Sequence, residues 1–185
     1  AAAVRARVPL DRGMKLLDYG CGTGALGFPL AQEVGTALLA DTSPGMLAVC
    51  DDKIAEHRLH HVRTVALDLA ADTLPDALAT TRFDLIVSAM TLHHVPDTAR
   101  LLATFHDLLA PGGHLCIADL DSEDGSFHGP EVDVHPGFDR ADLAAQIADA
   151  GFATCEFDTV YAIHKDSEAG PRDYPVFLLH AQRAA

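Results

Sequence analysis

The sequence has little positive charge and no tryptophan. It carries 13 Lys and Arg against 27 Asp and Glu, which gives a formal net charge of −14. Nucleic acids are bound mainly by Lys and Arg that neutralise phosphates, and anionic membrane surfaces attract basic segments. Because no run of Lys or Arg interrupts this acidic background, we expect neither a nucleic acid nor a membrane as a partner.

Cysteines are few and widely spaced, and apolar runs are short. The four cysteines form no CxxC pair, which argues against a cysteine zinc site and against a dense disulfide framework. No run approaches the roughly 20 apolar residues that a transmembrane helix needs, and no signal peptide is evident. We therefore expect a cytoplasmic protein.

The length predicts one domain. A chain of 185 residues that is 49% hydrophobic can build a full core without metal or disulfide support. We expect a single domain over residues 1–185, in which residues 1–14 form an N-terminal segment. Because the chain begins at Ala1 and not at methionine, truncation of this segment is an open alternative. The composition gives no indication of an oligomeric state.

Apolar runs alternate with helix-like stretches, which is typical of βαβ units around a parallel sheet. Ser43, Asp97 and Asp139 each precede a helical pattern and are predicted to cap a helix. The last two strands are joined by the short loop 165–173, which indicates an antiparallel hairpin. The expected strands are 15–19, 36–40, 62–67, 83–88, 114–119, 153–163 and 174–182. The pattern predicts an α/β fold with a doubly wound, mostly parallel seven-stranded sheet.

A glycine-rich segment, LLDYGCGTG, links the first expected strand to a helix. The amide groups and the dipole at a helix N-terminus favour an anionic ligand group. Ligands of such sheets bind at the carboxyl ends of the strands. Asp41 ends the second strand, 21 residues after Gly20, where a carboxylate suits the hydroxyls of a ribose. The segment therefore predicts a nucleoside cofactor.

Two cofactors fit this segment. Gly20, Gly22 and Ala25 match G-x-G-x-x-G/A, the fingerprint of a dinucleotide such as NAD. Asp18 favours S-adenosylmethionine, because a carboxylate at this place would repel a pyrophosphate and attract the ammonium of a methionine moiety. Gly24 also comes one position early for the dinucleotide spacing. A third interpretation, in which these residues only build a turn, stays open.

Four segments together resemble one family. They are LLDYGCGTG, ADTSPGML (residues 40–47), FDLIVSAMTLHHVPD (residues 83–97) and LLAPGGHLCIADL (residues 108–120). From Lys15 to its C-terminus the chain resembles the class I S-adenosylmethionine-dependent methyltransferases of the small bacterial, Rossmann-like branch. The resemblance implies strand order 3-2-1-4-5-7-6 with strand 7 antiparallel, S-adenosylmethionine as cofactor and S-adenosylhomocysteine as product. Many relatives carry helices before the first strand, whereas here only about 14 residues precede Lys15.

The resemblance also implies which residues bind the cofactor. Asp18 and the backbone of the glycines would hold the methionine end, and Asp41 would accept from the ribose hydroxyls. Asp68 would accept from the adenine amino group beside the Leu69 amide, and Ser88 with Ala89 would form the floor under the sulfonium. The full implied set is Asp18, Gly20, Gly22, Gly24, Asp41, Thr42, Met46, Asp68, Leu69, Ser88 and Ala89.

Methyl transfer from a sulfonium depends mainly on positioning, and it needs a base only where the acceptor carries a proton. His93 and His94 follow the fourth strand, and an ordinary imidazole pKa of about 6.5 suits such a base. In the alternative interpretation one of them is structural and the other is solvated.

The acidic loop 119–128 follows the fifth strand and is expected to rim the pocket. Asp119, Asp121 and His128 are its candidate acceptor-binding residues, and a merely solvated loop is the alternative. Its carboxylates with His128 and His135 also suit a metal with oxygen and nitrogen ligands, but we expect no metal.

The sequence therefore predicts a methyltransferase that acts on a small molecule. One alternative is an NAD-dependent oxidoreductase, although the Y-x-x-x-K spacing of Tyr161 and Lys165 falls on an expected strand rather than on a helix beside the cofactor. A second alternative is a protein that binds the cofactor without transferring a methyl group.

Overall fold

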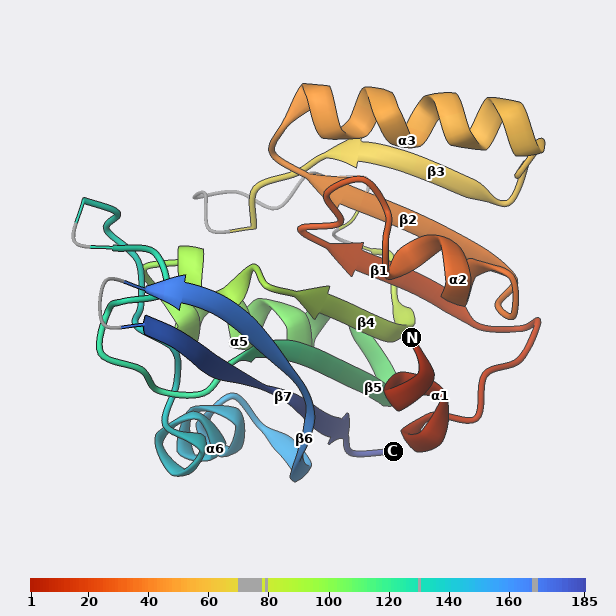
Figure 1. Ribbon diagram of the computed structural model, residues 1–185. Helices are drawn as coiled ribbons and strands as arrows, with labels where there is room; N and C mark the ends of the chain where they lie inside the picture. Colours follow the sequence, from red (N-terminus) through yellow and green to blue (C-terminus); the bar gives the residue numbers. More distant parts are fainter. Residues whose placement is uncertain (70–77, 79, 130, 168–169) are drawn as a thin grey trace.

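A computed structural model of the chain describes residues 1–69, 78, 80–129, 131–167 and 170–185 (Figure 1). Within this part of the chain, a seven-stranded sheet has the order β3-β2-β1-β4-β5-β7-β6. Its strands are β1 (Lys15–Tyr19), β2 (Thr36–Asp41), β3 (Val62–Ala66), β4 (Phe83–Ala89), β5 (Leu109–Leu120), β6 (Phe152–Ser167) and β7 (Gly170–Arg183).

The direction of the strands confirms the predicted fold class. Strands β1 to β5 pair in parallel, whereas β7 runs antiparallel to both β5 and β6. The chain reverses its course across the sheet between β1 and β4, so the carboxyl ends of these two strands diverge into different loops. Ligands of doubly wound sheets bind at such a switch point.

Helices cover both faces of the sheet (Figure 1). One face packs against α1 (Ala2–Arg7), α2 (Gly27–Ala31) and α3 (Pro44–His57), and the other against α5 (Thr98–Leu108) and α6 (Arg140–Asp149). A short 3-10 turn, η1 (Leu92–His94), follows β4. Among the described residues, no helix combines the length and the apolar character needed to cross a bilayer.

Three helices begin where the sequence predicted. The side chain of Ser43 accepts from the Met46 amide at 3.4 Å, and Asp97 accepts from the Arg100 amide at 3.0 Å. Asp139 accepts from the amides at the start of α6, the shorter contact being 2.8 Å. Each contact satisfies an amide that has no partner within the first turn of its helix.

Three segments differ from the expectation. The predicted loop 165–173 is largely strand, because Lys165 pairs with Arg172 and extends the hairpin. Strand β5 begins at Leu109, since the Pro-Gly-Gly turn is absorbed in a register shift against β4. The N-terminal segment forms α1, whose Val4 is buried and whose Arg7 pairs with Glu156 and Asp158 of β6. In each case distant backbone or side chains decide the local structure.

Candidate active site

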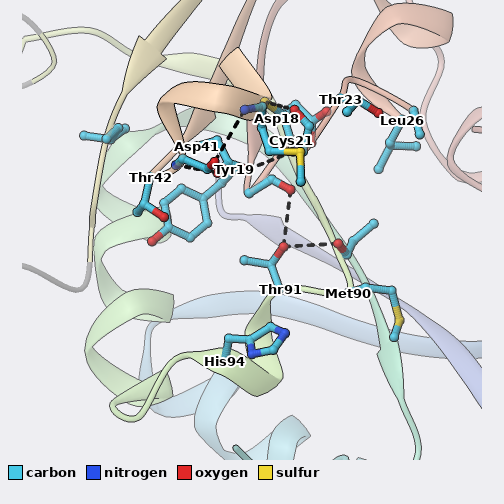
Figure 2. Close-up of a pocket in the computed structure, with 17 residues that line it drawn as sticks. Asp18, Tyr19, Cys21, Thr23, Leu26, Asp41, Thr42, Met90, Thr91 and His94 are labelled. Atoms are coloured by element: carbon cyan, nitrogen blue, oxygen red, sulfur yellow. Dashed lines mark hydrogen bonds between the residues drawn. The ribbon is translucent and has the colours of Figure 1, made fainter. Parts of the chain in front are cut away.

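A cavity of about 590 Å³ lies at the carboxyl ends of β1, β2 and β4 (Figure 2). Its walls come from the glycine loop after β1, the turn after β2 and the segment after β4. The lining residues are Asp18, Tyr19, Gly20, Cys21, Gly22, Thr23, Ala25, Leu26, Asp41, Thr42, Ser43, Met46, Leu67, Ala89, Met90, Thr91 and His94. This is the edge where the sequence predicted a nucleoside cofactor.

The glycines of the loop have two different structural roles. Gly20 and Gly22 have φ values of +68° and +53°, which residues with a side chain rarely adopt. A Cβ at Gly20 would overlap the side chain of Thr91, whereas a Cβ at Gly22 would meet no described atom within 4 Å. Gly20 therefore serves the close packing of β1 against the β4 segment, and Gly22 leaves its backbone open to the cavity.

We expect Gly20→Ala to lower the free energy of unfolding by about 2–3 kcal/mol. The left-handed backbone contributes about 1–2 kcal/mol, and displacement of Thr91 accounts for the remainder. Gly45→Ala is the control, because Gly45 lies in α3 with its Cβ position open, and alanine there should raise stability by about 0.5–1 kcal/mol. Urea unfolding measures both variants, and equal effects of the two substitutions would contradict this role of Gly20.

Asp18 is a buried carboxylate with an incomplete set of partners. Its side chain is 1% exposed, it lines the cavity, and its Oδ2 has no hydrogen-bond partner among the described residues. Burial raises the pKa of Asp18 to about 7, the Gly27 amide opposes this rise, and the charge of Asp41 adds to it. A cation at this place would supply the missing partner and stabilise the charged form.

Asp41 is held in position by two backbone amides. Its Oδ2 accepts from the Gly22 amide and its Oδ1 from the Ser43 amide, both at 2.8 Å. These contacts link the glycine loop to the turn after β2 and leave further lone pairs of the carboxylate for a ligand, because an ionised carboxylate has about four acceptor positions. The carboxylate lines the cavity, as its predicted ribose role requires.

The structure brings most of the implied cofactor residues together, but not all. Those that line the cavity are Asp18, Gly20, Gly22, Asp41, Thr42, Met46 and Ala89. Gly24 packs against the ring of Phe28 instead. Asp68 is exposed just beyond β3, and its adenine role stays a prediction.

Two implied residues require correction. The Ser88 hydroxyl is buried and donates to the Tyr19 carbonyl at 2.9 Å, so it holds β4 to β1 and does not form the cavity floor. The Leu69 amide donates to the Tyr19 hydroxyl at 3.3 Å, so it is engaged within the protein. Ser88 differs from the expectation because alternate residues of a strand face opposite sides of the sheet. Leu69 lies in a turn beyond β3, where the nearby Tyr19 hydroxyl takes up its amide.

Met90 and Thr91, directly after β4, also line the cavity and were not predicted as site residues. Met90 has φ of +54°, and its amide donates to the Ala118 carbonyl at 2.8 Å. Thr91 donates to the carbonyls of Gly20 and Ala89, so it holds the glycine loop against this segment (Figure 2). The signal for these residues is their position at the end of a central strand.

Cys21 also lines the cavity, but burial raises the pKa of its thiol strongly, which disfavours a thiolate.

Three histidines meet beside the cavity. His93 is buried, and its Nδ1 lies 2.7 Å from Asp119 Oδ1 while its Nε2 lies 3.0 Å from His128 Nε2. His94 is exposed and lines the cavity, below Thr91 and away from the glycine loop in Figure 2. Of the two candidate bases, only His94 therefore reaches the cavity, and His93 is engaged at both ring nitrogens.

The surroundings favour the neutral imidazole at two of these histidines, His94 and His128. Burial lowers the pKa of His94, and the neighbouring His93 and His128 lower it further. Burial also lowers the pKa of His128, to which His93 and Lys165 contribute in the same direction. Neutral rings keep one nitrogen lone pair each, so they can accept a proton or bind a metal ion.

Two carboxylates of the acidic loop are engaged within the fold. Asp119 is completely buried and accepts from His93 and from the Leu120 amide. Asp121 forms a two-point ion pair with Arg140 at 2.6 and 2.7 Å. The expectation that Asp119 and Asp121 rim the acceptor pocket is corrected, because both side chains have partners within the fold.

A second cavity of about 250 Å³ adjoins the first through His94, which lines both. Its other lining residues are His93, Pro96, Asp133, Val134, His135 and Pro136. The loop after β5 is fixed here by the His135 amide, which donates to the His93 carbonyl at 2.9 Å. The arrangement thus offers a large cavity for a nucleoside and a smaller space next to it for a second molecule.

Several of the known proteins that this chain resembles are methyltransferases. A family model described as "Methyltransferase domain" matches residues 10–167. An uncharacterized methyltransferase of Schizosaccharomyces pombe is 32% identical over 67% of this chain and 44% of its own length. A ubiquinone biosynthesis O-methyltransferase of Xylella fastidiosa is 33% identical over 62% of this chain and 45% of its own length. The matched part of this chain thus spans less than half the length of either relative.

A solved structure supports the fold. The crystal structure of an S-adenosylmethionine-dependent methyltransferase from Aquifex aeolicus has a TM-score of 0.68 and 20% sequence identity. The similarity covers 98% of this chain and 88% of the other. At this identity the match is evidence for the fold alone, and it agrees with the predicted Rossmann-like sheet.

Proposed function

Because the chain belongs to the methyltransferase domain family, we propose that it transfers a methyl group from S-adenosylmethionine to a small-molecule acceptor. Family membership confirms the resemblance to class I S-adenosylmethionine-dependent methyltransferases, and with it the predicted cofactor. The alternative of an NAD-dependent oxidoreductase receives no support from these comparisons. We therefore propose which residues bind the cofactor and which class of acceptor receives the methyl group.

The observation that carries the proposal is the unpartnered Oδ2 of Asp18. A buried carboxylate oxygen without a hydrogen-bond partner is costly, and a cationic ligand group that binds at the cavity would satisfy it. S-adenosylmethionine carries an ammonium group at its methionine end, which supplies both charge and donors. Gly22 lines the same cavity as Asp18, and the lack of a side chain there leaves space for a ligand.

Further features fit the rest of the cofactor. Asp41, fixed by two amides, would accept from the ribose hydroxyls, and Met46 with Thr42 would flank the nucleoside. Ala89 and Thr91 would lie near the sulfonium, where methyl transfer depends on positioning. The acceptor would approach from the second cavity, past His94, since this residue lines both spaces.

The acceptor class rests on the charge and on the size of the second cavity. A space of about 250 Å³ fits a small molecule, and the net charge of −14 disfavours nucleic acids. One matched relative is a ubiquinone biosynthesis O-methyltransferase, which makes a hydroxyl the first acceptor to test here. A protein that binds the cofactor without transfer would take up S-adenosylmethionine and show no turnover in an acceptor screen.

The test is calorimetric titration of the purified chain with S-adenosylmethionine, S-adenosylhomocysteine and NADH. We expect micromolar binding of the two sulfur nucleosides and none of NADH. Binding of NADH alone would overturn the interpretation of Asp18.

Asp41→Ala should weaken the binding of S-adenosylhomocysteine at least tenfold. Hydrogen bonds to a charged group contribute about 1.5–3 kcal/mol, which corresponds to roughly a ten- to hundredfold change. Asp52→Ala is the matched control, because Asp52 is an exposed carboxylate of α3 outside the cavity, and its affinity should equal that of the unmodified chain. Unchanged affinity in folded Asp41→Ala would refute the ribose role.

A further inference from the structure

Side chains from three separate positions form one histidine cluster (His93, His94 and His128). His93 and His94 come from η1 after β4, and His128 comes from the loop after β5. One ring nitrogen from each lies within 4.8 Å of the others, and the ring centroids are 4.1, 4.9 and 5.3 Å apart. These imidazoles gather at the carboxyl edge of the sheet.

The buried carboxylate of Asp119 orients one imidazole of this cluster. Its Oδ1 accepts from His93 Nδ1 and from the Leu120 amide, and its Oδ2 accepts from the His93 amide. A carboxylate at Nδ1 fixes the tautomer of the imidazole, so the lone pair of His93 is at Nε2 and points towards His128. Carboxylates in this position orient metal-binding histidines and raise their basicity.

We propose that His93, His94 and His128 bind a divalent transition metal ion of the zinc type, with Asp119 as the positioning carboxylate. Three nitrogen ligands at about 2.0–2.1 Å around a tetrahedral ion lie roughly 3.4 Å apart. The pair His93 and His128, now at 3.0 Å, needs to open by a few tenths of an ångström, and the exposed His94 needs to close on them. The proposed site departs from the expectation of no metal. It uses His128 with two histidines of η1 in place of His135 and the acidic loop.

Three protein ligands leave a fourth position for a water or a substrate atom, as in catalytic zinc sites. His94 places this position between the two cavities. An acceptor hydroxyl bound there would release its proton to solvent more readily, because the ion stabilises the oxygen anion. That oxygen would form the new bond to the methyl carbon as the carbon–sulfur bond breaks, leaving S-adenosylhomocysteine. Only this use of the ion rests on the proposed function; metal binding itself does not.

The test is titration of the chelator-treated chain with Co²⁺, whose visible absorption reports a low-symmetry, four-coordinate nitrogen site. We expect one equivalent to develop this absorption and Zn²⁺ to abolish it. His128→Ala and His94→Ala should each lower the affinity at least about a hundredfold, since even loss of a supporting carboxylate costs ten- to hundredfold. Both residues are at least partly exposed, so these variants should fold.

His60→Ala is the matched control, because His60 is an exposed histidine outside the cluster, and its Co²⁺ binding should remain within twofold of the unmodified chain. Absence of the Co²⁺ absorption, or its persistence in His128→Ala, would overturn the proposed site. Titration of the same samples with S-adenosylhomocysteine separates the two proposals. Co²⁺ binding without nucleoside binding would refute the proposed function and leave the metal site standing. Nucleoside binding without Co²⁺ binding would refute the metal site and leave the proposed function standing.

Discussion

Replacing Asp18 with asparagine is expected to remove about 4 kcal/mol of pH-dependent destabilisation from the ligand-free protein. Burial raises the pKa of this carboxyl to about 7 in the folded chain, whereas an unfolded chain titrates it near 3.9. Between these values the folded state binds a proton that the unfolded state has lost, so stability falls as the pH rises through this window. Three pKa units at 1.36 kcal/mol each give the expected magnitude.

The measurement is urea unfolding of the unmodified chain and of Asp18→Asn between pH 4 and pH 8. The difference in unfolding free energy between the two should shift by about 4 kcal/mol in favour of the variant over this range and level off above pH 7. Asp52→Asn is the control, since an exposed carboxylate of α3 should leave the pH profile unchanged. Parallel profiles for the unmodified chain and Asp18→Asn would show that Asp18 titrates normally.

Such a destabilising group is understandable as part of a binding site. Functional residues commonly violate the rules that govern a stable core, and the cost is accepted elsewhere in the fold. A bound ammonium would favour the charged form of Asp18, so cofactor binding near neutral pH should release a proton from this carboxyl. The proposed binding of the cofactor's ammonium group thus accounts for a buried carboxylate that destabilises the ligand-free protein.

The fold could be predicted because its signals are local and repeated. Ser43, Asp97 and Asp139 cap their helices through contacts within three residues, and such contacts are visible in a sequence. The glycine loop and Asp41 could be placed for a related reason, since parallel strands bring their carboxyl ends to one edge. The strand order was implied by the resemblance and is confirmed by the pairing.

The rest depends on contacts between distant segments. Nothing local to Val4 and Val8 shows that α1 packs on the sheet, because their burial requires strands that follow much later in the chain. The polar residues at the tip of the β6–β7 hairpin are strand because their backbones pair, which composition does not reveal. The histidine cluster likewise joins residues 34 or 35 positions apart, of which His93 and His94 were predicted as bases and His128 as an acceptor-binding residue.

Asp119 is the clearest case in which a residue predicted to bind the acceptor proves to be buried within the fold. The spacing placed it at the end of β5, where the chain leaves the sheet, and there an acidic residue is usually solvated. The structure instead buries it completely under η1, where it accepts from two amides and one imidazole. We expect Asp119→Ala to lower the free energy of unfolding by about 3–5 kcal/mol, since removal of one partner leaves the others buried and unsatisfied.

Asp121→Ala provides the comparison within the same segment. Its ion pair with Arg140 has equally short contacts, but the two side chains are 24% and 33% exposed, so its loss should cost no more than about 1 kcal/mol. Urea unfolding at one pH measures both variants, and equal losses would contradict the structural role of Asp119. Asp119 and Asp121 lie two residues apart, and each has strong partners. They differ mainly in whether water can replace those partners, so the difference in stability between the two variants measures the effect of burial.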